Sequence, residues 1–264
     1  MRPPLFFMHI PRCAGTSMRA FLRSQYPASE VCPAEGWKDL GPLGGLAPAW
    51  LAPFNLWQGH FHRNLMDLLP KGTMTLVILR DPVRRTVASI RHTMRDPHYH
   101  ADHGRMWGRR LQELIRDPEI MRPQTDVQAR YLCATADGAY TAHYSMTHRA
   151  DGSQAEPGDL EIQPTIEAAK QWLRSMMFIG VAEDIPALLD QLCPVMGFDR
   201  HALFPRANVN PGGDVLDGLD PEDLAVVRSY VPVDIALYEF ARKLIKDRAR
   251  RPWIVRRVGG VRFC

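Results

Sequence analysis

The run from Leu5 to Met18 constrains the fold more strongly than any other part of this chain. Its first part, Leu5–Ile10, is a nearly continuous apolar stretch, long enough for a buried strand and too short for a helix. Pro11 ends the stretch, small residues fill positions 14–17, and apolar residues then recur at helical spacing from Met18. We therefore predict a strand, a glycine-containing turn and a helix in immediate succession.

A turn of this kind is suited to binding an anion. It directs backbone N–H groups at one point, and the N-terminus of the following helix adds partial positive charge there. Arg12 adds a full charge, and Thr16 and Ser17 supply hydroxyls that also suit a helix N-cap. We predict a phosphate or sulfate site; the alternative is a structural turn in which these hydroxyls only cap the helix.

The turn does not match the P-loop of nucleoside triphosphatases, because it has one glycine and no Lys before Thr16. Its sequence, H-I-P-R-C-A-G-T-S, instead resembles the 5′-phosphosulfate loop of sulfotransferases, particularly the group of carbohydrate 2-O-sulfotransferases and their bacterial relatives. That loop typically reads I-P-K-T-A-G-T-S, so a Lys is replaced by Arg, which forks instead of ending in a point charge. The resemblance implies that the 5′-phosphate is held by Arg12, Cys13, Ala14, Gly15, Thr16 and Ser17, and that Arg12 also acts in catalysis.

A second segment resembles the same family's 3′-phosphate site, strand-R-D-P-x-x-R-x-x-S. The strand signature 75–79 runs directly into Arg80-Asp81-Pro82. The resemblance implies that Arg80 binds the 3′-phosphate of the donor. The family's serine position falls on Ala88, and the hydroxyl comes one residue later, at Ser89, about 100° further around the helix. An ion pair at the strand end is the alternative role for Arg80.

A Gly-His pair lies between these two segments, at 59–60. In the family this His is the base that takes the acceptor proton, and a neutral imidazole suits that task near pH 7. The resemblance implies this role for His60, with His62 as a second candidate. Because the chain has ten His, a structural role is the alternative.

Weaker likenesses follow, and the resemblance spans roughly residues 5–210. The segment 126–132 resembles a family helix near the acceptor cleft, which implies acceptor contacts by Gln128 and Arg130; solvated helix positions are the alternative. The segment 178–183 resembles a V-G-x-x-E strand, although Glu183 also suits an N-cap for the next helix. Residues 208–210 resemble a loop near the cofactor.

The periodicity predicts four strands and eight helices. The strands are expected at 5–10, 55–59, 75–79 and 177–182, and the helices at 16–25, 63–69, 82–94, 105–116, 124–134, 164–176, 184–196 and 221–247. Alternating strands and helices favour a parallel sheet with helices on both faces and ligands at the carboxyl ends of the strands. The family implies a P-loop-like three-layer α/β/α fold with a central, mainly parallel sheet. Two long irregular stretches, 27–54 and 135–163, are expected to shape the acceptor site.

Composition favours one domain over 1–264, with a core of about 5–247 and a basic tail at 248–264. Hydrophobic content of 45% and charged content of 23% are typical of soluble proteins, and no apolar run is long enough for a membrane span. An early strand leaves no room for a signal peptide, and five cysteines without a CxxC pair suggest reduced thiols. We expect a cytoplasmic enzyme of bacterial type.

Positive charge is concentrated at the C-terminus. Residues 241–264 hold nine Lys/Arg and one Asp, a net +8, so the rest of the chain carries −4 of its total of +4. The tail suits an anionic membrane surface or an acidic acceptor, and a cationic helix end followed by a packed strand is the plainer alternative. An acidic body without a recognition motif argues against nucleic-acid binding. His98, His100, Asp102 and His103 match no standard zinc spacing, which favours a polar loop.

Together these features predict a sulfotransferase. The resemblance implies transfer of a sulfuryl group from 3′-phosphoadenosine 5′-phosphosulfate (PAPS) to a hydroxyl or amine of a carbohydrate, glycolipid or small metabolite, releasing adenosine 3′,5′-bisphosphate (PAP) without a metal. One alternative is a P-loop-like small-molecule kinase using ATP-Mg, with Asp81 as metal ligand. The other is a non-catalytic relative that binds an acidic ligand through Arg12 and Arg80. The sequence predicts neither the acceptor nor the oligomeric state.

Overall fold

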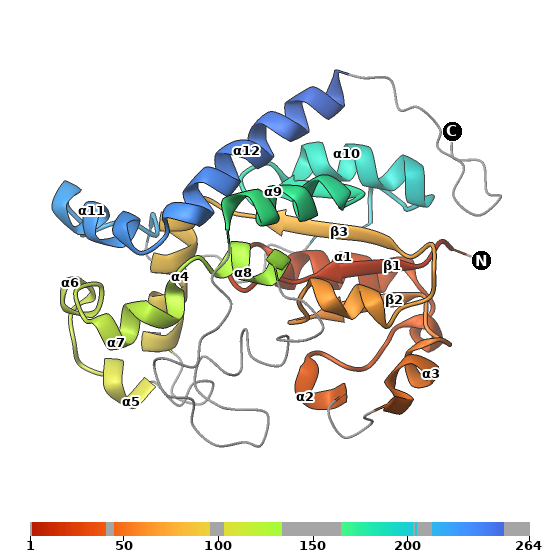
Figure 1. Ribbon diagram of the computed structural model, residues 1–264, viewed down its shortest axis with the longest axis horizontal. Helices are drawn as coiled ribbons and strands as arrows, with labels where there is room; N and C mark the ends of the chain where they lie inside the picture. The colour runs from red at the N-terminus through yellow and green to blue at the C-terminus, as the bar shows by residue number, and fades with distance from the viewer. Residues whose placement is uncertain are drawn as a thin grey trace.

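A central sheet of four parallel strands organises the computed structural model (Figure 1). The structure describes residues 2–40, 45–95, 103–133, 165–202, 204 and 213–250. The strands are β1 (Leu5–Met8), β2 (Leu56–Gly59), β3 (Met74–Leu79) and β4 (Phe178–Val181), in the order β2-β1-β3-β4. Apart from partly exposed Val181 at the end of β4, their residues are buried, and parallel strands that are buried on both faces have mostly apolar sequences, as these do.

The strand register brings the three predicted motifs to one edge of the sheet. Met8 pairs with Gly59 on one side and with Val77 on the other, so β1 and β2 end together and β3 extends slightly further. The chain leaves each strand at the same edge, toward Arg12, His60 and Arg80. This is the edge at which open α/β sheets bind ligands.

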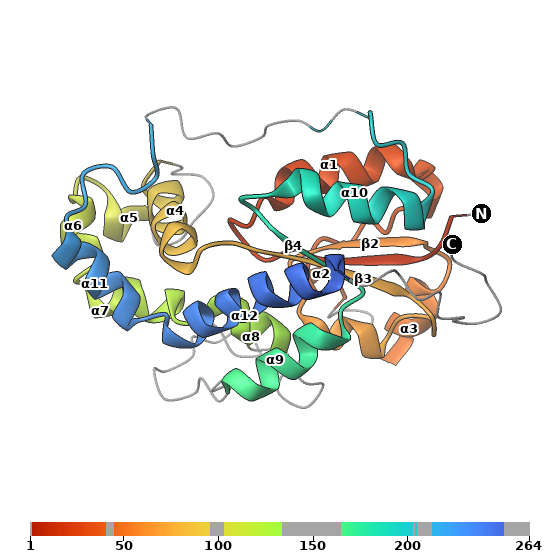
Figure 2. The same ribbon diagram turned by 90° about the horizontal axis from the view of Figure 1, so that it is seen from above.

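Helices cover both faces of the sheet, an arrangement compatible with three α/β/α layers (Figure 2). The helices α1 (Gly15–Gln25) and α10 (Ile185–Met196) lie on one face. The helices α8 (Val127–Cys133), α9 (Ile166–Ser175) and α12 (Pro232–Ala249) lie on the other. The main apolar core fills the space between these layers and includes Phe6, Phe21, Trp57 and Tyr131.

A second apolar cluster lies beyond the end of β3. It is formed by α4 (Pro82–Arg95), α5 (His103–Met106), α6 (Leu111–Leu114), α7 (Pro118–Met121) and α11 (Pro221–Ser229), seen at the left of Figure 1. Val83, Val87 and Ile90 of α4 pack there against Leu114 and Val227. One face of helix α4 therefore packs in this cluster, and another faces the edge of the sheet.

Most predicted elements are confirmed within a few residues, but two helices that were predicted to be continuous are each divided in two. The helix predicted at 105–116 is divided into α5 and α6, because the chain turns at Gly108, whose φ of 75° favours glycine. The helix predicted at 221–247 is divided into α11 and α12. The break falls at Val231, since the following Pro232 disfavours helical backbone in the residue before it.

The stretch predicted to be irregular, 27–54, holds regular structure where it is described. It contains α2 (Trp37–Leu40), α3 (Ala47–Leu51) and the 3₁₀ turn Ala28–Glu30. Two isolated parallel bridges, Val31 to Leu56 and Gly36 to His60, extend the sheet beyond β2. The helix predicted near 63–69 is a 3₁₀ helix, Arg63–Asp67, and a further 3₁₀ turn is Arg122–Gln124.

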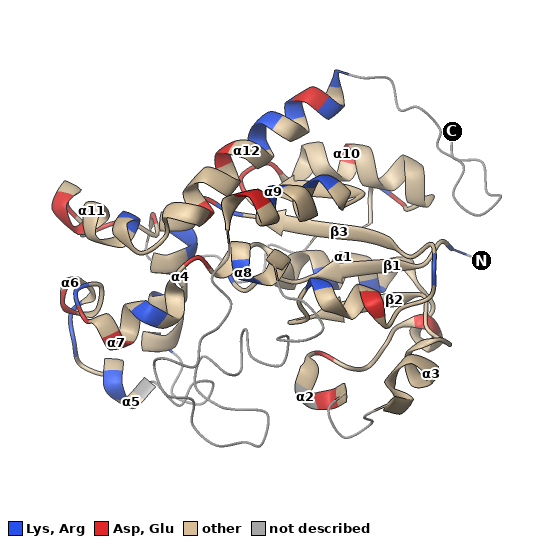
Figure 3. Cartoon of the chain, in the orientation of Figure 1, with Lys and Arg blue, Asp and Glu red and all other residues tan. Residues whose placement is uncertain are grey.

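Basic residues gather along the second half of α12 (Figure 3). Arg242, Lys243, Lys246 and Arg248 lie on it, followed by Arg250. The rest of the basic tail, 251–264, lies outside the described residues, as does the loop 135–163. Across the described ranges, none of the helices combines the length and the apolar character needed to cross a bilayer.

Candidate active site

The turn between β1 and α1 has an unusual backbone. Arg12 (φ 67°) and Ala14 (φ 58°) are both left-handed, a conformation that residues other than glycine seldom adopt. Left-handed residues in such a turn rotate successive N–H groups toward one side and form an anion-binding concavity. Strain of this kind is retained mainly at functional sites. The backbone therefore supports the predicted anion site.

The first turn of α1 has no side-chain cap. Its N-cap is Ala14, which has no side-chain acceptor, so the alternative in which Thr16 or Ser17 only caps the helix is wrong. Ser17 is buried and Thr16 is exposed on the first turn. A helix start whose N–H groups no side chain caps keeps its partial positive charge available to a ligand.

Four arginines concentrate positive charge beside this turn. The pKa of Arg12 is lowered, and burial is the largest cause. Three neighbours of like charge lower the same pKa further: Arg80, Arg95 and Arg85. Arg80 reaches the turn directly, because its Nη1 donates to the Arg12 carbonyl at 3.0 Å. Like charges this close repel one another, and an anion placed among them reduces that repulsion.

Arg85 is fully buried within this cluster. Its Nη2 donates to Oε1 of Gln124 at 2.7 Å and contacts the Thr86 hydroxyl at 3.3 Å. Burial lowers the pKa of Arg85, and Asp234 partly opposes that change. The Nε atoms of Arg85 and Arg12 are both buried, and among the described residues neither has a hydrogen-bond partner. Such donors are rare in proteins and are consistent with a ligand that supplies the acceptors.

His60 follows β2 and lies against the strained turn. Its Nδ1 is 3.0 Å from the His9 carbonyl, which assigns the proton to Nδ1 and the lone pair to Nε2. The ring stacks on the His9 ring at 4.4 Å. Burial lowers the pKa of His60, partly offset by its bond to the His9 carbonyl. The imidazole is therefore neutral near pH 7, as a proton acceptor must be.

Two glycines make room for this histidine pair. A Cβ on Gly15 would lie 2.6 Å from Cγ of the His9 ring and still closer to the ring's far atoms. A Cβ on Gly59 would lie 2.7 Å from the Glu35 carbonyl carbon, which belongs to the segment paired with His60. Close approach of neighbouring atoms requires glycine at both positions; Gly15 is itself a predicted site residue, and Gly59 directly precedes His60.

His62 is a core residue in this structure. Its Nδ1 accepts a hydrogen bond from the Trp37 indole at 3.2 Å, which places the proton on the buried Nε2. Its ring packs edge-on against Tyr131 at 4.3 Å. Burial lowers the pKa of His62 to about 3. The only lone pair is occupied by Trp37, so this geometry favours His60 over His62 as the base.

Gln128 and Arg130 are both buried, so the alternative that they are solvated helix positions is wrong. The Gln128 amide bonds to the backbone of Arg80 through both its oxygen and its nitrogen. Arg130 donates to the Thr125 carbonyl, and burial lowers its pKa to about 10. Gln128 thus contacts a predicted site residue instead of facing solvent.

Ser89 and Ala88 lie in different surroundings on α4. Ala88 packs in the second apolar cluster with Val83, Val87 and Ile90. Ser89 is half-buried and follows Arg85 by four residues, so it lies on the same side of the helix as that arginine. The displaced hydroxyl therefore lies on the side of α4 that carries Arg85, whereas Ala88 is buried in the apolar cluster.

The acidic residues next to Arg80 have structural partners. Asp81 Oδ1 accepts from the Arg84 N–H at 2.9 Å and so caps α4, in place of the ion pair considered for Arg80. Glu183 accepts from the Asp81 N–H at 3.0 Å and from the Tyr238 hydroxyl at 2.9 Å. The N-cap of α10 is Asp184, so the alternative that Glu183 caps this helix is wrong.

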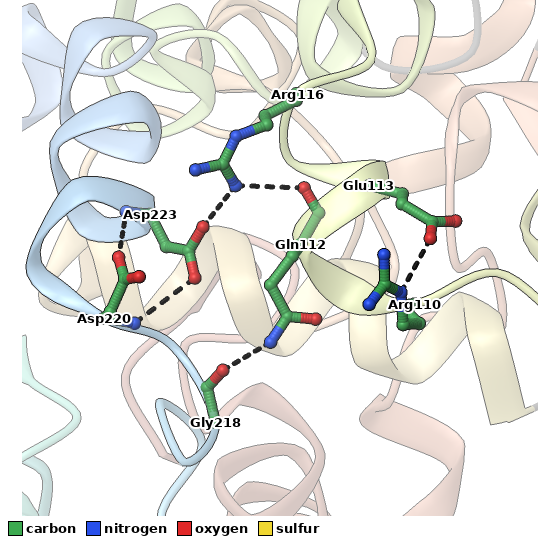
Figure 4. Close-up of a pocket in the computed structure, with 7 residues that line it drawn as sticks. All are labelled: Arg110, Gln112, Glu113, Arg116, Gly218, Asp220 and Asp223. Atoms are coloured by element: carbon green, nitrogen blue, oxygen red, sulfur yellow. Dashed lines mark hydrogen bonds and ion pairs between the residues drawn. The ribbon is translucent and has the colours of Figure 1, made fainter.

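A surface hollow elsewhere on the molecule differs in charge from the arginine cluster (Figure 4). It lies between α6 and α11 and has a volume of about 380 Å³. Both of its arginines are paired with carboxylates: Arg116 with Asp223, and Arg110 with Glu113 at 2.7 Å. Asp220 adds a third carboxylate to the lining, so this hollow lacks the excess of positive charge found beside the β1–α1 turn.

Sequence reasoning missed Arg85 and Arg95. Arg85 is the second arginine of the R-D-P-x-x-R pattern and was available as a signal, whereas Arg95 becomes visible only when α4 is placed against the turn. His98, His100, Asp102 and 208–210 lie outside the described residues, as does the His103 side chain. In the described ranges there is no group of three His, Cys, Asp or Glu arranged to hold a metal.

Comparisons with known proteins do not identify a family. No protein-family model matches the chain, and no match is found among curated proteins.

Proposed function

We propose that this chain is a sulfotransferase that uses PAPS as donor on a P-loop-like frame. The observation that carries the proposal is the cluster of Arg12, Arg80, Arg85 and Arg95 around an uncapped helix N-terminus, with neutral His60 beside it. A donor with two separate phosphates fits two arginines, Arg12 and Arg80, that follow different strands of the sheet. The sequence resemblance assigns Arg12 to the 5′-phosphate and Arg80 to the 3′-phosphate.

In this proposal the donor spans the edge of the sheet. The amides of Ala14–Ser17 hold the 5′-phosphate, and the Arg12 guanidinium lies at the oxygen that bridges phosphorus and sulfur. Arg80 binds the 3′-phosphate, and Ser89 shares that phosphate from α4. Arg85 adds positive charge to the site. Among the described residues its guanidinium bonds to Gln124, and no carboxylate lies at ion-pair distance from it.

The reaction is an in-line transfer. The acceptor oxygen or nitrogen forms a bond to sulfur while the bond from sulfur to the bridging oxygen breaks, and PAP leaves. The acceptor's proton passes to Nε2 of His60, the nitrogen with the lone pair. Arg12 offsets the negative charge that grows on the bridging oxygen. Catalysis then rests on positioning and electrostatic stabilisation, and a sulfuryl group, less charged than a phosphoryl group, requires no divalent metal.

The acceptor is proposed only by class, as a hydroxyl or amine of a carbohydrate, glycolipid or small metabolite. Glu35 is the carboxylate that raises the pKa of His60, and it is ion-paired with Arg19 and Arg23, which reduces its attraction for a cationic acceptor.

A ligand comparison tests the proposal. We expect PAP in EDTA to raise the melting temperature by several degrees and ATP with Mg²⁺ to raise it less, since only PAP reaches Arg80 with a 3′-phosphate. A larger shift with ATP-Mg would contradict the proposal and favour the kinase alternative.

Transfer is measured next, as a mass gain of one SO₃ group on candidate acceptors supplied with PAPS. His60→Ala should abolish most of the transfer and retain PAP binding. Transfer at the wild-type rate in this variant would remove His60 from the mechanism. Absence of transfer to every acceptor class, with PAP binding intact, would favour a non-catalytic anion-binding protein.

A further inference from the structure

The side chain of Gln128 continues the sheet beyond the end of β3. Its Oε1 accepts from the backbone N–H of Arg80 at 2.9 Å, and its Nε2 donates to the carbonyl of the same residue at 3.0 Å. Strand pairing with β4 stops at Leu79, so these two backbone groups have left the sheet's own ladder. The Gln128 amide replaces a neighbouring strand at this one residue.

The same amide also reaches the β1–α1 turn. The Cys13 thiol is 3.6 Å from Gln128 Oε1, and the thiol is buried. On the other side, the Arg80 guanidinium donates to the carbonyl of Arg12 at 3.0 Å. Arg80 is therefore held by its backbone on α8 and by its side chain on the turn.

Gln128 is itself held rigidly. The buried carboxylate of Asp234, in α12, accepts from the Gln128 N–H at 3.1 Å and from the Ala129 N–H at 2.7 Å. In return, Asp126 Oδ1 accepts from the Asp234 N–H at 2.9 Å. The first turns of α8 and α12 cap each other, and this exchange fixes the position from which the Gln128 side chain extends.

We propose that Gln128 is a positioning residue that presents Arg80 to the 3′-phosphate of the donor. The inference rests on the proposed function and extends it, because the Gln128 side chain is buried and is used to hold Arg80. Its amide oxygen and its amide nitrogen both bond to the backbone of Arg80. Its contribution therefore passes through Arg80 and should affect one phosphate of the donor more than the other.

Calorimetric titration with PAP and with adenosine 5′-monophosphate tests this selectivity. Gln128→Met preserves length and removes both bonds to Arg80. We expect it to weaken PAP binding about tenfold and to change binding of adenosine 5′-monophosphate by less than about twofold. If Gln128→Met fails to fold, Gln128→Asn is used instead. It keeps an amide on a side chain one methylene shorter, and we expect the same loss of selectivity.

Gln112→Met is the matched control. The Gln112 amide donates to the Gly218 carbonyl between α6 and α11, so the control removes a similar bond far from Arg80 and should leave both affinities unchanged. Equal weakening of both nucleotides by the Gln128 variants, or no weakening, would overturn the inference. If wild-type protein itself binds PAP no better than adenosine 5′-monophosphate, the proposed function fails instead.

Discussion

Gly15→Ala tests the packing beneath the β1–α1 turn. The added Cβ would lie 2.6 Å from Cγ of the His9 ring, whereas ordinary contacts begin at 3.4 Å, and the ring's far atoms would be closer still. The ring cannot rotate away easily, because it is buried and stacked between Phe7 at 5.7 Å and His60 at 4.4 Å. Either the ring or the start of α1 must therefore move by about 1 Å or more.

We estimate the cost from two contributions. Overpacking of a buried site costs about 1–3 kcal/mol, and loss of the aromatic stack adds about 1 kcal/mol. A total of about 3 kcal/mol would lower the melting temperature by roughly 6–12 °C in a chain of this size. A shift of about 1 Å at His60 would also reduce transfer about 100-fold.

Thermal denaturation measures this cost, with Gly104→Ala as the control. A Cβ on Gly104 meets no atom within 4 Å, so we expect that variant to be neutral or stabilised by up to about 1 kcal/mol. His9→Ala removes the obstructing ring, so the double variant Gly15→Ala/His9→Ala should be more stable than the sum of the single effects by about 1–3 kcal/mol. Wild-type stability of Gly15→Ala, or strict additivity with His9→Ala, would refute this account of the packing.

Three further predictions concern charge. Burial raises the pKa of Asp234 to about 6 from 3.8, so the folded state holds this proton more tightly, and the resulting stability is lost as pH rises through 6. Wild type should therefore lose about 3 kcal/mol relative to Asp234→Asn between pH 4 and 7 in urea titrations; a flat or rising difference contradicts this. Because the pKa of His60 is lowered, transfer should fall to half only below pH 6.5, and a midpoint above that value would contradict the lowered pKa. Arg12→Ala should weaken PAP binding about 10- to 100-fold, measured by calorimetry, whereas Arg110→Ala, in the hollow between α6 and α11, should leave it unchanged.

The sequence predicted the frame of the site because local patterns determine it. A short apolar run followed by small residues specifies a strand, a turn and a helix, and three such strand ends meet at one edge of a parallel sheet. The turn itself could be predicted, but its left-handed Arg12 and Ala14 could not, since neither residue favours that conformation. Their backbone is imposed by the surrounding packing.

Other features of the site depend on tertiary contacts. The surroundings of Gln128 are set by the caps exchanged between α8 and α12, which hold it against Arg80. The R-D-P-x-x-R pattern contains Arg85, but periodicity alone does not show that this arginine is buried in the site. The division of 221–247 into two helices is a local effect, because Pro232 marks it in the sequence.

Calorimetric titration of PAP in EDTA, beside adenosine 5′-monophosphate and adenosine 3′-monophosphate, tests the central claim of a two-phosphate donor site most directly. The account predicts one PAP bound per chain, at least about tenfold more tightly than either monophosphate, since each phosphate has its own arginine. Equal affinities for PAP and adenosine 5′-monophosphate, or the absence of binding, would contradict it.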